Sequence, residues 1–124
     1  MTLLITGSSG HLGQAIVTLL RRAGRPAVGI DTRPADTTNI VGSITNPDTV
    51  AQAMSGITGV IHTATLHKPH VATHSRQDFV DTNVTGTLNI MQAATDLGVS
   101  RVVHTSTSEV YGTAQYVPID EAHP

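Results

Sequence analysis

The sequence contains no cysteine and no tryptophan, and only one phenylalanine and two tyrosines among its 124 residues. Without cysteine, disulfides, thiolate metal sites and cysteine nucleophiles are all excluded. Because so few aromatic residues are available, we expect a core of valine, isoleucine, leucine and alanine. Such a core is typical of a buried parallel sheet that is covered by helices.

Charged residues and long apolar runs are also scarce. Charged side chains make up 13% of the chain, the formal net charge is −2, and the seven cationic residues are scattered, so no basic footprint for nucleic acid is formed. No apolar run approaches the ~20 residues that cross a bilayer, and the first residues are typical of a strand rather than a signal peptide. We therefore expect one cytoplasmic domain without nucleic-acid or membrane partners.

Apolar patterning alternates between strands and helices along the whole chain. Short apolar runs closed by glycine or polar residues predict buried strands, and apolar residues at helical spacing predict the helices between them. Strands are predicted over residues 2–6, 27–30, 40–41, 57–62 and 101–106. Helices are predicted over residues 12–22, 47–54 and 76–97, with a loop over 63–75.

This alternation predicts an α/β fold, a doubly wound parallel sheet of the Rossmann type with strand order 3-2-1-4-5. In such a sheet, ligands bind at the carboxyl ends of the strands, where the order reverses between the first and the fourth strand. The long helix over 76–97 is predicted to have one apolar face, marked by Val80, Val84, Leu88, Met91 and Ala94.

A glycine-rich turn follows the first predicted strand and opens the first helix. Its glycines have the spacing GxxGxxG: one for the tight turn, one for close approach to a phosphate, and one for packing of the helix on the sheet. Backbone amides at the helix N-terminus would face a pyrophosphate. A purely structural turn is the alternative. The predicted cofactor-binding residues of the turn are Gly7, Ser9, Gly10, His11, Leu12 and Gly13.

An acidic residue ends the second predicted strand, eighteen residues after the glycine turn. Asp31 is placed to accept hydrogen bonds from the adenosine ribose hydroxyls, and its charge repels a 2′-phosphate, which favours NAD over NADP. Arg33 would bind that phosphate instead, so NADP stays the alternative cofactor. A solvated turn carboxylate is the other interpretation of Asp31.

Four segments occur in an order that is typical of one family: TGSSGHLG (6–13), GVIHTA (59–64), NVTGT (83–87) and TSTSEVYG (105–112). Together they resemble the extended short-chain dehydrogenase/reductase family of NAD-dependent nucleotide-sugar epimerases and dehydratases. The likeness covers nearly the whole chain. It implies that residues 1–124 form an NAD(P)-binding Rossmann domain and that the substrate is a nucleotide sugar, oxidised transiently by NAD.

The resemblance also implies catalytic residues in the TSTSEVYG segment. Thr107 matches the hydroxyl that hydrogen-bonds the reacting oxygen, and Glu109 matches a base beside the ketone in some dehydratases. A positioned hydroxyl and a desolvated carboxylate are chemically suited to these tasks. The alternatives are a hydroxyl that satisfies backbone at a strand end, and a solvated loop carboxylate.

Further cofactor contacts follow from the resemblance. The family often has an aspartate that meets the adenine after the third strand, where this chain has Ser43 and Ile44, and Ser43 would bind more weakly. The backbone after the fourth strand is expected to line the cofactor groove at Thr63, Ala64 and Thr65. The amide of Asn83 is expected to tie neighbouring loop backbones together.

One family feature is missing from this chain. The family's base is a tyrosine followed four residues later by a lysine, whereas the only lysine here is Lys68. The resemblance therefore implies a chain truncated at the C-terminus, without its substrate-binding part; the alternative is a non-catalytic NAD(P)-binding or regulatory module. Family dimers form through two helices per subunit, of which residues 76–97 would supply one, so a homodimer is left open.

Four histidines, His62, His67, His70 and His74, fall within thirteen residues. Neutral imidazoles at these intervals suit Zn²⁺. However, Pro69 interrupts any helical register and no carboxylate lies between them, so we expect no metal site but a loop with one histidine that contacts substrate. His11 and His104 are expected on a helix surface and a strand.

Overall fold

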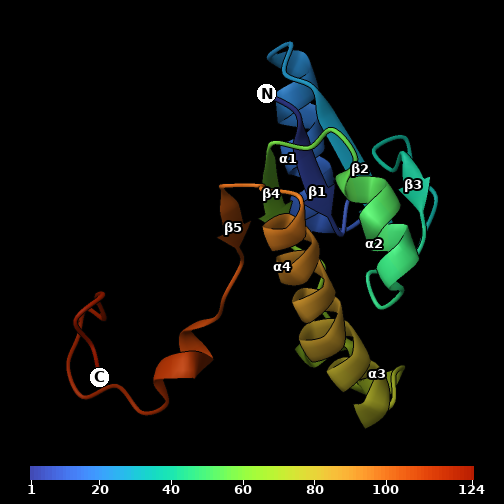
Figure 1. The fold of residues 1–124 in the computed structure, drawn as a ribbon. Coiled ribbons are helices and arrows are strands. Elements are labelled where there is room, and N and C mark those ends of the chain that lie inside the picture. Colours follow the sequence, from blue (N-terminus) through green and yellow to red (C-terminus); the bar gives the residue numbers. More distant parts are fainter.

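Five parallel strands form one sheet in the order β3-β2-β1-β4-β5 (Figure 1). The structure is a computed structural model that describes residues 1–124. The predicted fold class, strand order and parallel direction are confirmed. The strands are β1 (Leu3–Thr6), β2 (Ala27–Asp31), β3 (Ile40–Val41), β4 (Gly59–His62) and β5 (Val102–His104).

Three strands are shorter than predicted, and the first of them, β1, begins at Leu3 rather than residue 2. The fourth begins at Gly59 rather than residue 57, because Gly59 is paired with Leu3, the first residue of β1. The fifth covers only three of the six predicted residues. β5 pairs with β4 alone, from Val60–Val102 to His62–His104, so the ladder ends where β4 ends.

The helices are α1 (His11–Arg22), α2 (Pro47–Met54), α3 (Arg76–Val80) and α4 (Thr87–Asp96). No helix has the length and apolar character that a membrane span requires. The side chain of Asn46 caps α2 by accepting from the amides of Asp48 and Thr49, and Pro47 occupies the first turn, as predicted. The prediction of a loop over residues 63–75 is wrong in its middle, where a 3-10 helix covers Lys68–Ala72 with a proline in its first turn.

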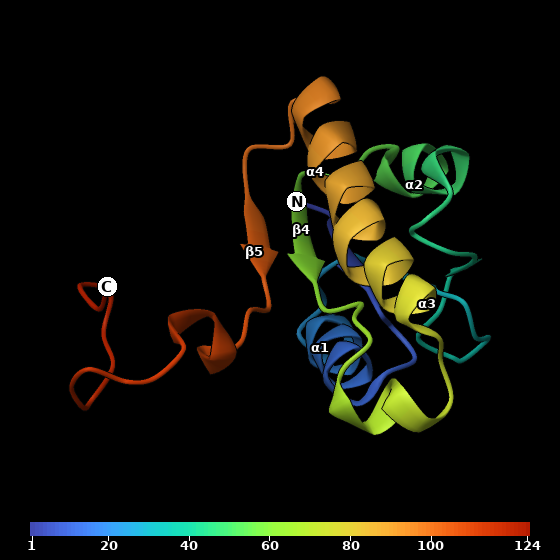
Figure 2. The same ribbon diagram turned by 90° about the horizontal axis from the view of Figure 1, so that it is seen from below.

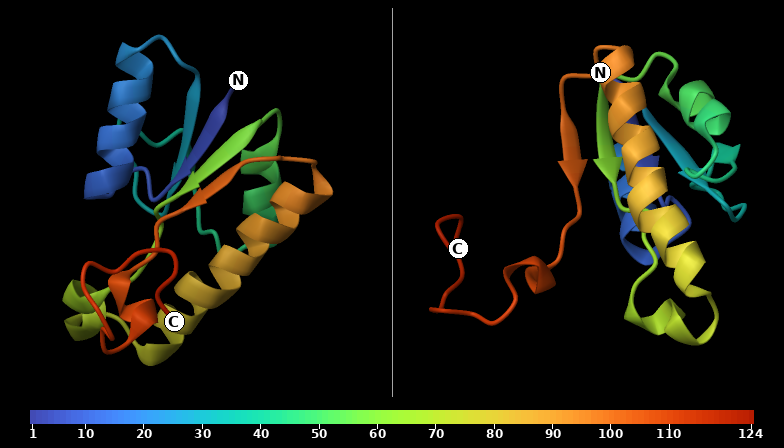
Figure 3. Two further views of the ribbon diagram at one scale, coloured as in Figure 1. Left: turned by 90° about the vertical axis from the view of Figure 1, so that its left-hand side faces the viewer. Right: turned by 60° about the horizontal axis from the view of Figure 1, so that its bottom comes forward.

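The helices lie on both faces of the sheet (Figures 2 and 3). One face is covered by α1, whose Val17 packs with Leu3 and Ile5. The other face is covered by α2 and α4, whose apolar residues form the main core with Leu4, Ile30 and Val60. Successive residues of β1 therefore point into opposite layers, and all four are buried.

The long predicted helix is interrupted by a wide turn. Residues 81–86 form a π-helical segment that joins α3 to α4. A π-helical turn contains more residues than an α-helical turn, so it shifts the angular phase of everything that follows. The predicted apolar face is wrong for Val80, Val84 and Leu88, which are 49%, 61% and 62% exposed, and right for Ala94, which is buried. The residues that face the core are Gly86, Ile90 and Ala94.

The phase of α4 gives a direct test. Ile90→Ala is expected to lower the free energy of unfolding by about 2–5 kcal/mol, because it opens a cavity in the main core. Leu88→Ala, two residues earlier on the same helix, is expected to change the free energy of unfolding of the monomer by less than about 0.5 kcal/mol, because Leu88 is exposed in the single chain. Chemical denaturation of both variants measures the difference. Equal losses of stability in the two variants would contradict the assignment of Ile90 to the core and Leu88 to the surface.

Candidate functional site

The carboxyl ends of β1 and β4 lie side by side where the strand order reverses. Thr6 ends β1 and is paired with His62, which ends β4. From there one loop runs into α1 and the other toward α3, on opposite faces of the sheet (Figure 3). In doubly wound sheets this divergence opens a crevice for a ligand.

The glycine turn between β1 and α1 is closely packed. Gly7 has a φ of 70°, and a Cβ on it would come within 2.9 Å of the backbone of Ala64. A Cβ on Gly13 would overlap the carbonyl oxygen of Gly7. Only glycine fits these two positions without a shift of backbone, as expected for a tight turn that lies close to a helix.

The first turn of α1 presents hydrogen-bond donors without acceptors. The amides of His11, Leu12 and Gly13 make no hydrogen bond within the protein, and no side chain caps the helix at Gly10. The hydroxyl of Ser9 is buried and also has no partner. Free amides and the helix dipole concentrate positive potential here, so the turn is suited to an anion such as a phosphate group.

Asp31, at the end of β2, is hydrogen-bonded to the glycine turn. Its Oδ2 accepts from the amide of Ser9 at 3.0 Å, and its Oδ1 accepts from the amide of Arg33 at 3.0 Å. A carboxylate has lone pairs for further donors, so ribose hydroxyls remain possible partners. The side chain of Arg33 is exposed to solvent.

The predicted cofactor contacts after β3, Ser43 and Ile44, have side chains that interact with other residues of the protein. The hydroxyl of Ser43 lies 2.8 Å from the hydroxyl of Thr45 and accepts from its amide at 3.1 Å. The side chain of Ile44 is 5% exposed and belongs to the main core. A cofactor contact by Ile44 therefore involves its backbone.

The loop after β4 is tied to β1 through the side chain of Thr6. The Thr6 hydroxyl accepts from the amides of Thr63 and Ala64, each at 3.1 Å, and the Thr63 hydroxyl donates to the Thr6 carbonyl at 2.6 Å. The same loop continues to Thr65, whose side chain is exposed. The three residues predicted to line the cofactor thus follow one another in the loop that leaves β4.

Asn83 fixes the next part of this loop. Its side-chain oxygen accepts from the amide of Leu66 at 2.8 Å, and its side-chain nitrogen donates to the Leu66 carbonyl at 2.8 Å. The hydroxyl of Thr65 also donates to Asn83 at 3.1 Å. The predicted role of Asn83, tying loop backbone in place, is confirmed.

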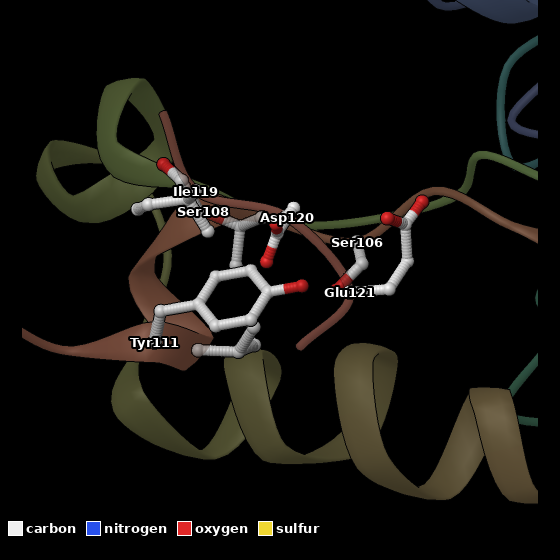
Figure 4. A pocket seen from close by; sticks show the side chains of 8 residues that line it. Ser106, Ser108, Tyr111, Ile119, Asp120 and Glu121 are labelled. Carbon is white, nitrogen blue, oxygen red and sulfur yellow. The ribbon is translucent and has the colours of Figure 1, made fainter. Parts of the chain in front are cut away.

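The predicted catalytic segment follows β5 and borders an open hollow of about 530 Å³ (Figure 4). The ring of Tyr111 lies across this hollow, with Asp120 and Glu121 from the C-terminal tail beside it. Thr107 lines the hollow, and its hydroxyl also accepts from the amide of Glu109 at 3.3 Å. Glu109 is exposed and is not part of the lining, so the structure does not bring the two predicted catalytic side chains together there.

The histidines of the predicted loop separate into two environments. His67, His70 and His74 contact one another edge to face, with ring centroids 4.7 Å and 5.5 Å apart. His62 is 1% exposed inside the sheet. His11 is exposed on α1, as expected.

The start of α1 offers free donors beside a glycine turn, as an anion site requires, and the chain also matches a known family. Residues 3–124 match the NAD dependent epimerase/dehydratase family. The chain belongs to this family. The family resemblance inferred from the sequence motifs is thereby confirmed.

Relatives of this epimerase/dehydratase family member include enzymes of different substrates. A 3-beta-hydroxysteroid dehydrogenase from Mycolicibacterium neoaurum is 36% identical over 98% of this chain. A short-chain dehydrogenase/reductase superfamily protein from Agrobacterium tumefaciens, solved with bound NAD, is 34% identical, with a TM-score of 0.89 over 100% of this chain. MoeE5, solved with UDP-glucose and NAD, is 32% identical, with a TM-score of 0.84 over 100% of this chain. The chain spans 36%, 38% and 42% of the length of these three proteins.

The residues of this family member fit a nicotinamide dinucleotide. The orphaned Ser9 hydroxyl and the free amides of α1 suit the pyrophosphate, and Asp31 lies at the strand end where the adenosine ribose is bound in Rossmann folds. Sequence reasoning overlooked Thr6 as the residue that joins the two walls of the crevice. Its neighbour His62 was considered only among the loop histidines, as a metal ligand or a substrate contact, because the pairing of Thr6 with His62 depends on the register of two strands that are far apart in sequence.

His62 is held uncharged by its surroundings. Burial, together with a smaller repulsion from His104, lowers the pKa of His62 from 6.5 to about 4. The folded chain therefore binds fewer protons at His62 than the unfolded chain does between these two pH values. The stability that His62 contributes is complete above pH 6.5 and is lost as the pH falls toward 4.

We expect the free energy of unfolding to fall by up to about 3 kcal/mol over this pH window because of His62 alone. Denaturant titrations at several pH values measure the slope. In His62→Gln, which does not titrate, this part of the slope is expected to vanish, while the contributions of other groups persist. An identical pH dependence in both proteins would contradict the assignment.

Proposed function

We propose that the chain binds NAD across the carboxyl ends of β1, β2 and β4. We further propose that it forms the cofactor-binding part of an epimerase or dehydratase that oxidises a hydroxyl of a nucleotide sugar transiently. The observation that carries this proposal is the cluster of unpaired donors at the start of α1, the Ser9 hydroxyl included. Membership in the NAD dependent epimerase/dehydratase family supports it.

Bound NAD would supply an acceptor for a hydride from a carbon that carries a hydroxyl, and it would return the hydride later. The amides of α1 and the Ser9 hydroxyl would hold the pyrophosphate. Asp31 would accept from the adenosine ribose hydroxyls and disfavour a 2′-phosphate, which makes NAD the expected form rather than NADP. The backbone of Thr63, Ala64 and Thr65 would line the crevice.

We propose that Thr107 and Glu109 act on the substrate. The Thr107 hydroxyl borders the open hollow and would donate to the reacting oxygen. Glu109 is exposed and its carboxylate makes no hydrogen bond within the protein, so it is free to accept a proton from the carbon beside the ketone. For both residues to act on one substrate, its binding would have to place the Thr107 hydroxyl and the Glu109 carboxylate beside the same carbonyl group.

The substrate class rests on two kinds of relative. MoeE5, solved with UDP-glucose and NAD, favours a nucleotide sugar. The steroid dehydrogenase relative favours a second candidate, oxidation of a sterol hydroxyl, which uses the same hydride chemistry.

Association of two copies is part of the same proposal. Val80, Val84 and Leu88 form an exposed apolar strip along the helical run from α3 to α4. Such strips support helix-to-helix contact between subunits.

Cofactor choice is tested by calorimetric titration of the chain with NAD and with NADP. We expect NAD to bind more tightly, and Asp31→Ala to reduce the preference, because the repulsion of the 2′-phosphate disappears. Arg33→Ala is the matched control and is expected to weaken NADP selectively. If the chain bound neither NAD nor NADP, the proposal would be overturned.

The catalytic assignment is tested in a form of the protein extended to the length of its relatives. With a nucleotide sugar, Glu109→Gln is expected to stop elimination while the dinucleotide is still reduced, since Glu109 acts after oxidation. Thr107→Val is expected to slow the oxidation itself by about 100-fold. Absorbance of the reduced dinucleotide and product analysis separate the two steps. Unchanged turnover in either variant would remove that residue from the mechanism.

A further inference from the structure

Three side chains form a continuous hydrogen-bonded line through the interior. The Thr6 hydroxyl of β1 lies 2.6 Å from Nδ1 of His62 in β4, and Nε2 of His62 lies 3.0 Å from the hydroxyl of Thr87 at the start of α4. Thr6 is 0% exposed and His62 is 1% exposed. The line therefore joins two strands and a helix without contact with solvent at its centre.

The direction of each hydrogen bond follows from the number of protons available. A hydroxyl has one proton and two lone pairs. The lone pairs of Thr6 accept from the amides of Thr63 and Ala64, so its proton must be donated to Nδ1 of His62. A neutral imidazole that accepts at Nδ1 carries its proton on Nε2, which then donates to Thr87. The geometry thus selects one tautomer of His62.

The Thr6 hydroxyl of this line also holds the backbone of the loop after β4. The amides of Thr63 and Ala64 belong to the first two residues after β4, and Ala64 lies directly against Gly7 of the glycine turn. Both amides depend on the lone pairs of a single hydroxyl. Without an acceptor for its own proton, the hydroxyl would leave a buried donor unsatisfied, which would favour turning the hydroxyl and giving up one of the two amides.

We propose that His62 is a positioning residue for the dinucleotide, and that it acts as the neutral Nε2–H tautomer. By accepting from Thr6 it keeps the backbone of Thr63 and Ala64 in the orientation that lines the cofactor. It does not touch the cofactor itself. This inference rests on the proposed binding of NAD.

The surroundings of the ring favour a histidine that is uncharged at neutral pH. Among the groups that face it from β1, β5 and α4, Thr6 and Thr87 carry no charge and His104 is the titratable one, with ring centroids 5.3 Å apart. Burial and His104 both lower the pKa of His62. A proton on Nδ1 would face the Thr6 proton, and the hydroxyl would have to turn and release an amide.

Calorimetric titration with NAD tests the positioning role in the 124-residue chain and its variants. Thr6→Val and His62→Leu are expected to raise the Kd for NAD by about tenfold, because the amides of Thr63 and Ala64 are no longer held in place. Thr6→Ser keeps the hydroxyl and is expected to bind NAD with the same affinity as the unsubstituted chain. His104→Gln is the control for a histidine in the same part of the sheet, and it is expected to leave the Kd unchanged. Circular dichroism shows whether each variant is folded.

Long-range ¹H–¹⁵N spectra of the unvaried chain give a second readout that needs no substitution. We expect the His62 signals of a neutral ring with its proton on Nε2 at neutral pH. A proton on Nδ1, or a charged ring, would overturn the proposal.

The calorimetric outcomes separate this inference from the proposed function. If the unvaried chain binds NAD and folded Thr6→Val and His62→Leu bind it equally well, the positioning role alone fails. If the unvaried chain binds no NAD, the proposed function fails and the positioning role fails with it.

Discussion

The site depends on the closeness of two backbone loops at Gly7. The backbone of Ala64 leaves no room for a side chain on Gly7, and the carbonyl of Gly7 leaves none on Gly13. This packing brings the loop after β4 within reach of the Thr6 hydroxyl and directs the unpaired amides of α1 toward the crevice. Each wall of the crevice is therefore positioned by the other, and the donors are in place before any ligand arrives.

Features that depend on neighbouring residues could be predicted from the sequence. The glycine turn, the Asn46 cap with Pro47, and the position of Asp31 at a strand end each follow from a few adjacent residues. The strand order also followed, because alternating strands and helices allow few topologies. The clasp of Asn83 on Leu66 came from the family resemblance, since nothing local predicts it.

Features that depend on register or phase could not be predicted. The pairing of Thr6 with His62 requires knowledge of how β1 and β4 align, and the burial of His62 follows from that alignment. The face of α4 was misassigned because apolar spacing alone does not reveal an extra residue in a helical turn. Thr107 and Glu109 are two residues apart in the motif, yet only Thr107 borders the hollow, because Glu109 lies within the 3-10 helix over Ser108–Tyr111, where its side chain is exposed to solvent.

The wide turn over residues 81–86 has a consequence for how one helix serves two tasks. Each residue of an α-helix advances the direction of the side chains by about 100°. Asn83 and Ile90 are seven residues apart and would lie on nearly the same face of a regular α-helix. The additional residue offsets the two directions, so that Asn83 clasps the loop after β4 while Ile90 is anchored in the core against the sheet. One helical run thereby presents two residues of nearly equal phase to two different neighbours.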